Sequence, residues 1–311
     1  MSRFRFLRQM IFDGRGYPPK PTAKPQPHSW SDDEITGSCL GHSTVLINLF
    51  GLWILTDPIF SLRAGPGIPP IKLGPKRYLQ PALRPREIPK PDVILLSHAH
   101  FDHFDTWSLW RFPLRTQIVT ARGTGDLLRR RGFRHVRELD WGQQASLLIR
   151  GRKLQITSIE VAHWGARMMR DDHRGYGGYI MDREGYSVCF AGDTAFTPAF
   201  ARLRERPRPI DLILMPIGAY NPWIRAHCDP EQAVSMANMA GARTFVPIHH
   251  ETFRLSHEPM DEPAKRIQAA FRRERNRLLS VHVGETFRVP LSHPREYNDQ
   301  GISSATERSN A

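Results

Sequence analysis

The sequence is poor in cysteine, and its three cysteines, Cys39, Cys189 and Cys228, are widely spaced. No CxxC pair occurs, which argues against both a disulfide framework and a cysteine-rich zinc site. Any bound metal would therefore be held by histidine and carboxylate side chains.

Long hydrophobic runs are also missing. The longest, TVLINLFGLWILT from Thr44 to Thr56, is interrupted by Asn48 and Gly51 and falls short of the roughly 20 residues that cross a bilayer. It predicts a β-hairpin instead. We therefore expect a cytoplasmic protein without a transmembrane helix.

The first twelve residues, MSRFRFLRQMIF, lack the uninterrupted apolar core of a signal peptide. Arginines alternate there with apolar residues, which would suit a short amphipathic helix in peripheral contact with an anionic membrane. A frayed terminus is the alternative. No signal peptide is expected.

Lysine is scarce: only seven of the 44 basic residues are lysines and 37 are arginines, against 31 acidic residues, for a formal net charge of +13. Arginine stays ionised and holds phosphate oxygens in bidentate fashion. This surplus suits an anionic partner such as a phospholipid headgroup, a nucleic acid or a phosphorylated metabolite. A well-solvated basic surface is the alternative, because net charge does not name a ligand.

The chain is predicted to have one domain between two tails. Proline is frequent in residues 17–28, which excludes a helix or a central strand, so residues 1–34 are expected to be a basic, proline-rich lead-in. Residues 35–291 form the predicted domain, and the polar residues 292–311 are expected to be disordered.

Within the domain, short β-branched segments alternate with helical signals at 123–132, 195–206, 229–240 and 261–275. Asp229, Pro230, Gln232 and Gly241 mark the ends of the third helix. The pattern predicts an α/β fold in which a sandwich of sheets is covered by helices.

Polar residues follow one apolar strand in LLSHAHFDHFD, residues 95–105. Alternate residues of an extended chain point the same way, so His98 and His100 are predicted to hold one ion while Asp102 and His103 face a second. Asp105 is predicted to cap a helix that begins at Thr106.

Three more apolar strands end in candidate ligands, namely His163, Asp193 and His249. Each alone could be a hydrogen-bonded core residue. Four strand ends of this kind together predict a metal centre, and two ions need a bridging carboxylate.

The motifs HAHFDH, AHW, AGDT and PIHH, in this order, resemble the metallo-β-lactamase fold of dinuclear metallohydrolases. The blocks GHSTVLI, ILTDPIFSLRAGP, GPKRYLQPA, MPIGAYNPW and DPEQAV resemble the branch of N-acyl phosphatidylethanolamine-hydrolysing phospholipase D. The resemblance implies a four-layered αββα sandwich. It also implies that one zinc is held by His98, His100 and His163, the other by Asp102, His103 and His249, and that Asp193 bridges them.

Two further residues follow from the resemblance. Asp57 is implied to hydrogen-bond the metal-bearing loop, although a helix-cap or turn aspartate before Pro58 is the alternative. His227 is implied to lie over the active site and to polarise a phosphoryl oxygen or protonate the leaving alkoxide, with a capping or surface histidine as the alternative. Asp193 and His227 are thus the expected catalytic residues.

The sequence departs from the branch after the last ligand, where His250 and Glu251 replace the usual aromatic residue and glycine. The added charge bears on substrate preference rather than on metal binding. The residues that bind the substrate, and the oligomeric state, are not predicted.

The implied function is a dinuclear metal-dependent phosphodiesterase of phospholipase D type. It would hydrolyse N-acyl phosphatidylethanolamine or a related phospholipid to phosphatidic acid and an alcohol, with residues 60–81 either contacting lipid or forming a covering loop. The alternatives are a lactonase, a nuclease or a non-catalytic scaffold, because a fold does not fix a function. No inserted domain that would clamp a polynucleotide is visible, so no obligate nucleic acid is expected.

The expected cofactors are two divalent ions. Zinc is the first expectation, and iron or manganese are alternatives because sites of histidine and carboxylate accept all three.

Overall fold

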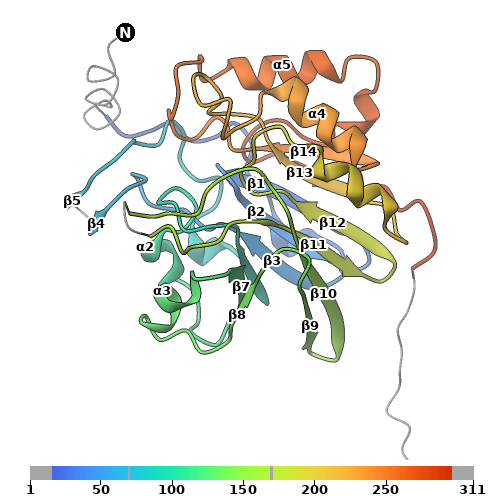
Figure 1. The fold of residues 1–311 in the computed structure, drawn as a ribbon, viewed down its shortest axis with the longest axis horizontal. Helices are drawn as coiled ribbons and strands as arrows, with labels where there is room; N and C mark the ends of the chain where they lie inside the picture. Colours follow the sequence, from blue (N-terminus) through green and yellow to red (C-terminus); the bar gives the residue numbers. More distant parts are fainter. Residues whose placement is uncertain (1–15, 69–70, 169–170, 296–311) are drawn as a thin grey trace, which may run out of the picture.

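A computed structural model describes residues 16–68, 71–168 and 171–295. Its centre consists of two mixed sheets packed face to face (Figure 1). The first sheet has the strand order β15 (Thr286–Arg288), β1 (Ile35–Gly41), β2 (Thr44–Leu49), β3 (Leu52–Thr56), β6 (Val93–Leu96), β7 (Gln117–Ala121) and β8 (Val136–Leu139). The second has the order β14 (Thr244–Ile248), β13 (Leu212–Pro216), β12 (Tyr186–Phe190), β11 (Gly178–Arg183), β10 (Arg152–Ile159) and β9 (Gln144–Ile149).

Each sheet changes from antiparallel to parallel pairing. In the first sheet β15, β1, β2 and β3 are antiparallel, and β3, β6, β7 and β8 run parallel. In the second, β9 to β12 are antiparallel and β12 to β14 run parallel. The parallel strands therefore deliver their carboxyl ends, and the loops that follow them, to one edge of each sheet.

The predicted hairpin at 44–56 is confirmed as β2 and β3. Phe50 and Gly51 form the turn, and both have positive φ, of 50° and 81°. Turns with two positive φ values match the twist of paired strands, which explains the glycine at this position.

Apolar side chains fill three interfaces between layers. Strand residues such as Ile47, Leu95, Tyr179 and Phe190 pack between the sheets. A second cluster joins the outer face of the second sheet to α4 (Pro230–Met239), α5 (Glu262–Ala270) and the 3₁₀ helix Pro198–Glu205. A third joins the outer face of the first sheet to α2 (Thr106–Leu109) and α3 (Gly125–Arg129).

The four-layered αββα sandwich is thus confirmed, with helices on the outer faces of both sheets (Figure 1). The predicted helix at 229–240 is present as α4, with the capping box between Asp229 and Gln232 and with Gly241, at φ 69°, just past its end. The segment at 195–206 folds as a 3₁₀ rather than an α-helix.

One short hairpin and three 3₁₀ turns complete the described elements. The hairpin of β4 (Gly67–Ile68) and β5 (Ile71–Lys72) projects from the body of the molecule (Figure 1), and single 3₁₀ turns lie at Pro27–Ser29, Pro85–Glu87 and Arg275–Arg277. The described part of the proline-rich lead-in packs on the domain: Gln80 donates hydrogen bonds to the carbonyl oxygens of Pro18 and Pro19.

The described helices include none that is both long and apolar enough to cross a bilayer. The amphipathic segment expected at residues 1–12, and most of the tail expected after residue 292, lie outside the described residues.

Candidate metal centre

The candidate ligands occupy the loops that follow four strands. His98, His100, Asp102 and His103 follow β6, and His163 follows β10. Asp193 follows β12, and His249 follows β14 directly. All four loops open on the same edge of the sandwich, so the structure brings together every residue that the sequence predicted as a ligand.

Three imidazoles form a first set. The Nε2 atom of His98 and the Nδ1 atom of His100 lie 2.8 Å apart, and the Nε2 atom of His163 lies 3.3 Å from the same Nδ1. The other ring nitrogen of His163 donates to the carbonyl oxygen of Ala226 at 2.9 Å, which leaves its Nε2 lone pair directed at the set. The hydroxyl oxygen of Ser97, 2.8 Å from Nδ1 of His98, accepts the hydrogen of that nitrogen, so the Nε2 lone pair of His98 is also directed at the set.

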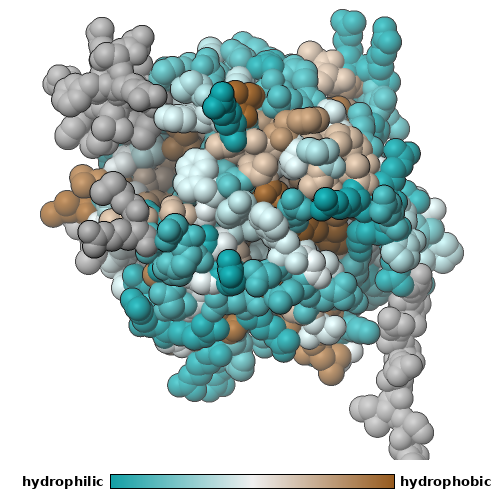
Figure 2. Space-filling model, viewed as in Figure 1, coloured by the Kyte–Doolittle hydropathy of each residue, from teal (hydrophilic) through white to brown (hydrophobic). Residues whose placement is uncertain are grey.

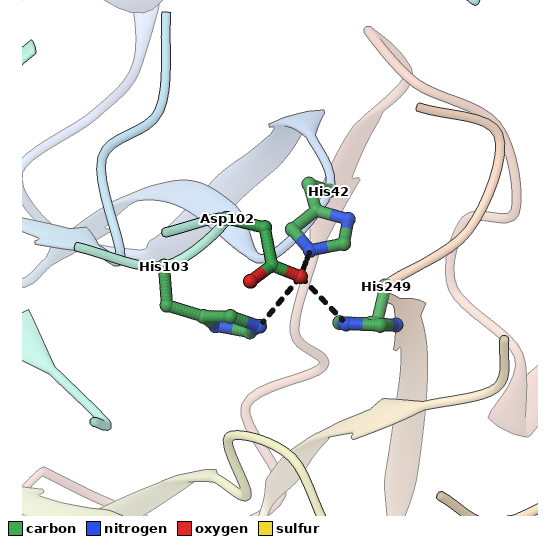
Figure 3. Close-up of side chains that lie close together, drawn as sticks. All are labelled: His42, Asp102, His103 and His249. Atoms are coloured by element: carbon green, nitrogen blue, oxygen red, sulfur yellow. Dashed lines mark hydrogen bonds and ion pairs between the residues drawn. The ribbon is translucent and has the colours of Figure 1, made fainter. Parts of the chain in front are cut away.

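Asp102, His103 and His249 form a second set, which Figure 3 shows converging on one carboxylate oxygen. The Oδ2 atom of Asp102 lies 3.7 Å from the Nε2 atoms of both His103 and His249. These three residues come from both sheets, because His249 follows β14 and the other two follow β6.

Asp193 lies between the two sets. Its Oδ2 atom is 3.1 Å from the Nε2 atoms of His103 and of His249, both in the second set. It is also 3.7 Å from the Nε2 atom of His163, which belongs to the first set. A carboxylate in this position has the reach of a bridging ligand.

The residues fit divalent cations. The Nε2 atoms of His103 and His249 and the Oδ1 atom of Asp193 are buried and make no well-aligned hydrogen bond to any described residue. Buried polar atoms without such a partner are rare, and a bound cation would supply one. Imidazole nitrogens with carboxylate oxygens are the ligands that zinc, iron and manganese accept.

Burial and charge give the two sets different protonation states. In the first set burial holds the pKa of His98 well below its usual range and lowers that of His163 to about 3. In the second set burial opposes protonation, but the charges of Asp193 and Asp102 outweigh it and raise the pKa of His249 to about 9. The same carboxylates hold the pKa of His103 well above its usual range. In the metal-free protein the second set is therefore a network of ion pairs.

Asp57 makes three hydrogen bonds to the loop of candidate ligands after β6. Its carboxylate accepts hydrogen bonds from the backbone N–H of Ser97 at 2.7 Å, from the Ser97 hydroxyl at 2.5 Å and from Nδ1 of His103 at 2.6 Å. The last contact keeps one proton on Nδ1 of His103, so that Nε2, which faces Asp193, is the nitrogen left to bind a cation.

His227 lies at the rim of the cluster. Its Nδ1 atom is 3.7 Å from Oδ2 of Asp193 and makes no hydrogen bond to a described residue. Burial lowers the pKa of His227 to about 4, so the ring is neutral at pH 7. A neutral ring can donate or accept a hydrogen bond, but it carries no acidic proton.

The prediction for Asp105 was half right. The residue precedes α2 at the N-cap position, but its side chain makes no capping hydrogen bond. Its carboxylate instead accepts hydrogen bonds from Lys72, Ser61 and the Ser108 hydroxyl, each at 2.5 Å. Lys72 and Ser61 are distant in sequence, so local spacing gave no sign of them.

Two residues of the site were not predicted. Arg167 donates hydrogen bonds to the carbonyl oxygens of Ala99 and Phe104, at 2.7 and 2.9 Å, and so spans the loop of candidate ligands after β6. His42 reaches Asp102 from the turn between β1 and β2 (Figure 3). His42 belongs to the GHSTVLI block, but a single histidine before a strand gives no sign of a contact with a metal site.

The replacement of the usual aromatic residue and glycine by His250 and Glu251 has a structural counterpart. Nε2 of His250 contacts the carbonyl oxygen of Val281 at 2.9 Å, and Glu251 pairs with Nδ1 of His282 at 2.6 Å. Both side chains thus join the loop after β14 to the segment before β15 rather than to the candidate ligands.

Comparison with known proteins agrees with this geometry. Residues 52–250 match the family model described as a beta-lactamase superfamily domain. An N-acyl-phosphatidylethanolamine-hydrolyzing phospholipase D of Caenorhabditis elegans is 30% identical over 82% of this chain and 76% of its own length. An uncharacterised protein of Mycobacterium tuberculosis is 32% identical over 89% of this chain and 72% of its own.

Solved structures share the fold. A metallo hydrolase from Ignicoccus hospitalis superposes with a TM-score of 0.60 at 21% identity, over 83% of this chain and 99% of that one. An isothiocyanate hydrolase from Delia radicum gut bacteria gives a TM-score of 0.64 at 17% identity, over 82% of this chain and all of that one. The chain therefore belongs to the beta-lactamase superfamily of metal-dependent hydrolases, in the family that includes the N-acyl-phosphatidylethanolamine-hydrolysing phospholipases D.

Proposed function

We propose that the protein is a dinuclear metal-dependent phosphodiesterase of phospholipase D type. Its substrate would be N-acyl phosphatidylethanolamine or a related phospholipid, and its products phosphatidic acid and an alcohol. The observation that carries the proposal is the position of Asp193, whose carboxylate lies within reach of both sets of imidazoles. The name of the relative from Caenorhabditis elegans supports the choice of substrate.

In this proposal His98, His100 and His163 hold one ion, Asp102, His103 and His249 hold the other, and Asp193 bridges them. When bound, such ions lower the pKa of water toward 7 and stabilise negative charge on phosphoryl oxygens. Zinc is our first expectation. Asp57, Ser97 and the Ala226 carbonyl keep the ligand imidazoles in the tautomers that offer a lone pair.

The hydrolysis needs no nucleophile from the protein, because water attacks phosphorus directly. The oxygen of water forms a bond to phosphorus, the bond from phosphorus to the alcohol oxygen breaks, and one proton from water ends on the departing alkoxide. The three cysteines are buried, and burial raises the pKa of Cys39 and Cys189 to about 12, so they remain thiols.

His227 is proposed to act on the phosphoryl group. Because its pKa is lowered and nearby cations would lower it further, the ring is neutral at pH 7. We therefore favour donation of a hydrogen bond to a phosphoryl oxygen over protonation of the alkoxide by an imidazolium. The His227 ring could reach a phosphoryl group bound at the two ions, because it lies beside the proposed bridging residue Asp193.

Exposed apolar side chains on the same loops favour a lipid substrate. Trp164 follows His163, Phe196 lies three residues after Asp193, and Trp223 lies in the loop that ends at His227; all three are exposed. The projecting β4–β5 hairpin presents apolar surface as well (Figure 2), with Ile71 79% and Leu73 55% exposed. Exposed apolar groups clustered beside a site are typical of contact with ligands or membranes.

The test is a panel of substrates with and without chelator: N-acylated and plain phosphatidylethanolamines, bis(p-nitrophenyl) phosphate, a lactone and a β-lactam. We expect chelator-sensitive release of phosphatidic acid and N-acylethanolamine, and in ¹⁸O-water the label should enter phosphatidic acid alone. Asp193→Asn should abolish turnover. Turnover of the lactone alone would show that the phosphodiesterase assignment is wrong.

The matched control is Asp211→Asn. Asp211 is an equally buried aspartate, but it precedes β13 at the opposite edge of the second sheet and pairs with Arg243 at 2.9 Å. Turnover should survive this substitution, which separates loss of a ligand from loss of any buried carboxylate.

A further inference from the structure

His42 is a buried histidine for which neither the proposed ligand sets nor the reaction provides a use. It lies in the turn between β1 and β2, and only 1% of the residue is exposed. Its Nε2 atom is 3.1 Å from Oδ2 of Asp102, the same oxygen that faces His103 and His249 (Figure 3).

The contacts of His42 differ from those of His103 and His249, the two histidines of the second set. Four imidazoles of the described residues lie within 4 Å of the Asp193 carboxylate, namely those of His103, His163, His227 and His249. His42 is not among them. His42 shares a cluster with Asp102, His103 and His249, but its Nε2 contacts Asp102 and not the shared carboxylate of Asp193.

The imidazole is held rigidly in this place. Its ring packs against those of His249, at a centroid distance of 4.0 Å, and of Phe253, at 5.3 Å. The backbone N–H of His42 donates to the Thr252 hydroxyl at 2.5 Å, and its carbonyl oxygen accepts from the N–H of His249 at 3.0 Å. His42 thus connects the loop after β14 to Asp102, which follows β6.

The backbone at this position does not favour histidine. His42 has φ 57°, in the left-handed region, which costs most residues with a β-carbon about 1 kcal/mol and suits glycine better. Its Nδ1 atom is also buried without a hydrogen-bond partner among the described residues. The imidazole thus occupies a backbone position that glycine would adopt at lower cost.

We infer that His42 is a positioning residue for the second metal set: its Nε2–H donates to Oδ2 of Asp102 and fixes the orientation of that carboxylate. Asp102 needs such a restraint because its side chain is 17% exposed, whereas those of His103 and His249 are fully enclosed. Hydrogen bonds to a ligating carboxylate commonly change metal affinity by about 10- to 100-fold. The inference rests on the proposed two-ion centre and adds a residue to it.

The test compares His42→Ala with His42→Gln, whose amide nitrogen can take the place of Nε2 as a donor. Each purified protein is dialysed against a graded zinc chelator, and the zinc per chain and the two dissociation constants are measured. We expect His42→Ala to weaken the second ion by about 10- to 100-fold while the first is retained, and His42→Gln to restore most of the affinity.

Two controls isolate the imidazole. His250→Gln replaces another buried histidine, whose Nε2 contacts the Val281 carbonyl oxygen and not Asp102, and it should leave both dissociation constants unchanged. Thr252→Val removes the acceptor of the His42 backbone N–H but keeps the imidazole, and it should lower the melting temperature more than the zinc affinity.

The outcomes separate the two proposals. If wild-type protein binds two zinc ions and His42→Ala binds both as tightly, the role of His42 is wrong while the metal centre stands. Equal weakening of both ions by His42→Ala would also overturn it, because a general loss of structure would explain that result. If wild-type protein binds no zinc, iron or manganese, the proposed function itself fails.

Discussion

A substitution at Asp57 tests what fixes the conformation of the loop of candidate ligands after β6. Its carboxylate accepts three hydrogen bonds, two from Ser97 and one from Nδ1 of His103. Asp57→Asn keeps the shape of the side chain but replaces one acceptor oxygen by an NH₂ donor. With the remaining oxygen bound to the Ser97 N–H, that donor faces His103.

His103 must then change its tautomer. Its Nδ1 becomes the acceptor and the ring proton moves to Nε2, the atom that lies 3.1 Å from Asp193. A protonated Nε2 has no lone pair for a cation. We expect the affinity for the second ion to fall by about 10- to 100-fold, or roughly 1.4 to 2.7 kcal/mol.

Chelator competition measures that affinity, and ¹⁵N spectra of the histidine rings in the zinc-loaded protein report which nitrogen of His103 carries the proton. Asp211→Asn serves again as the matched control and should lower stability without changing zinc binding. Ser97→Ala removes one donor to Asp57, together with the hydroxyl that orients His98 in the first set, but leaves the His103 contact in place, so it should have the smaller effect on the second ion. Wild-type affinity in Asp57→Asn, with the proton still on Nδ1 of His103, would refute the reasoning.

Four further predictions rest on the described contacts. Because the pKa of His249 is raised to about 9 in the metal-free protein, metal binding at pH 7 should release protons, and the affinity for metal should rise up to pH 9. Calorimetry in buffers of different ionisation enthalpy measures the number of protons released. An affinity that does not change with pH would contradict this prediction. The same raised pKa stabilises the metal-free fold fully below about pH 6.5, and this contribution is lost as pH rises through 9, so the metal-free melting temperature should fall over that range. Replacing Ile71 and Leu73 by serine should slow hydrolysis of a vesicle substrate by roughly tenfold or more and leave hydrolysis of bis(p-nitrophenyl) phosphate unchanged. Leu148→Ser, at a 76% exposed position on β9, is the control and should change neither rate. An equal loss on both substrates would rule out lipid contact. A β-carbon at Gly218 would lie 2.2 Å from the carbonyl oxygen of His249, so Gly218→Ala should cost about 1 to 3 kcal/mol of stability and weaken zinc retention; stability loss with unchanged zinc binding would show that the two are separable.

The sequence predicted best the features that depend on local pattern. Short apolar strands were recognised because their period and their turns are encoded within a few residues, as at Phe50 and Gly51. The capping box of Asp229 and Gln232 is equally local. Ligands at strand ends could be grouped because parallel strands bring their carboxyl ends to a common edge.

Long-range contacts could not be read in this way. The partner of Asp105 is Lys72, 33 residues away, and the packing of the β4–β5 hairpin brings them together. His42 and Asp102 are 60 residues apart, and the β1–β2 turn that unites them has no sequence period that points to a metal. Arg167 acts through backbone carbonyl oxygens, which leave no trace in the identity of the residues that carry them.

The origin of each candidate ligand set has a consequence for the stability of the molecule. Each set draws residues from both sheets: His98 and His100 with His163, and Asp102 and His103 with His249. An ion in either set would be a reversible cross-link between the two halves of the sandwich, in a chain whose three cysteines are free. One such ion at a thousand times its dissociation constant would add about 4 kcal/mol. Metal supply would then set not only how fast the protein works but how much of it stays folded.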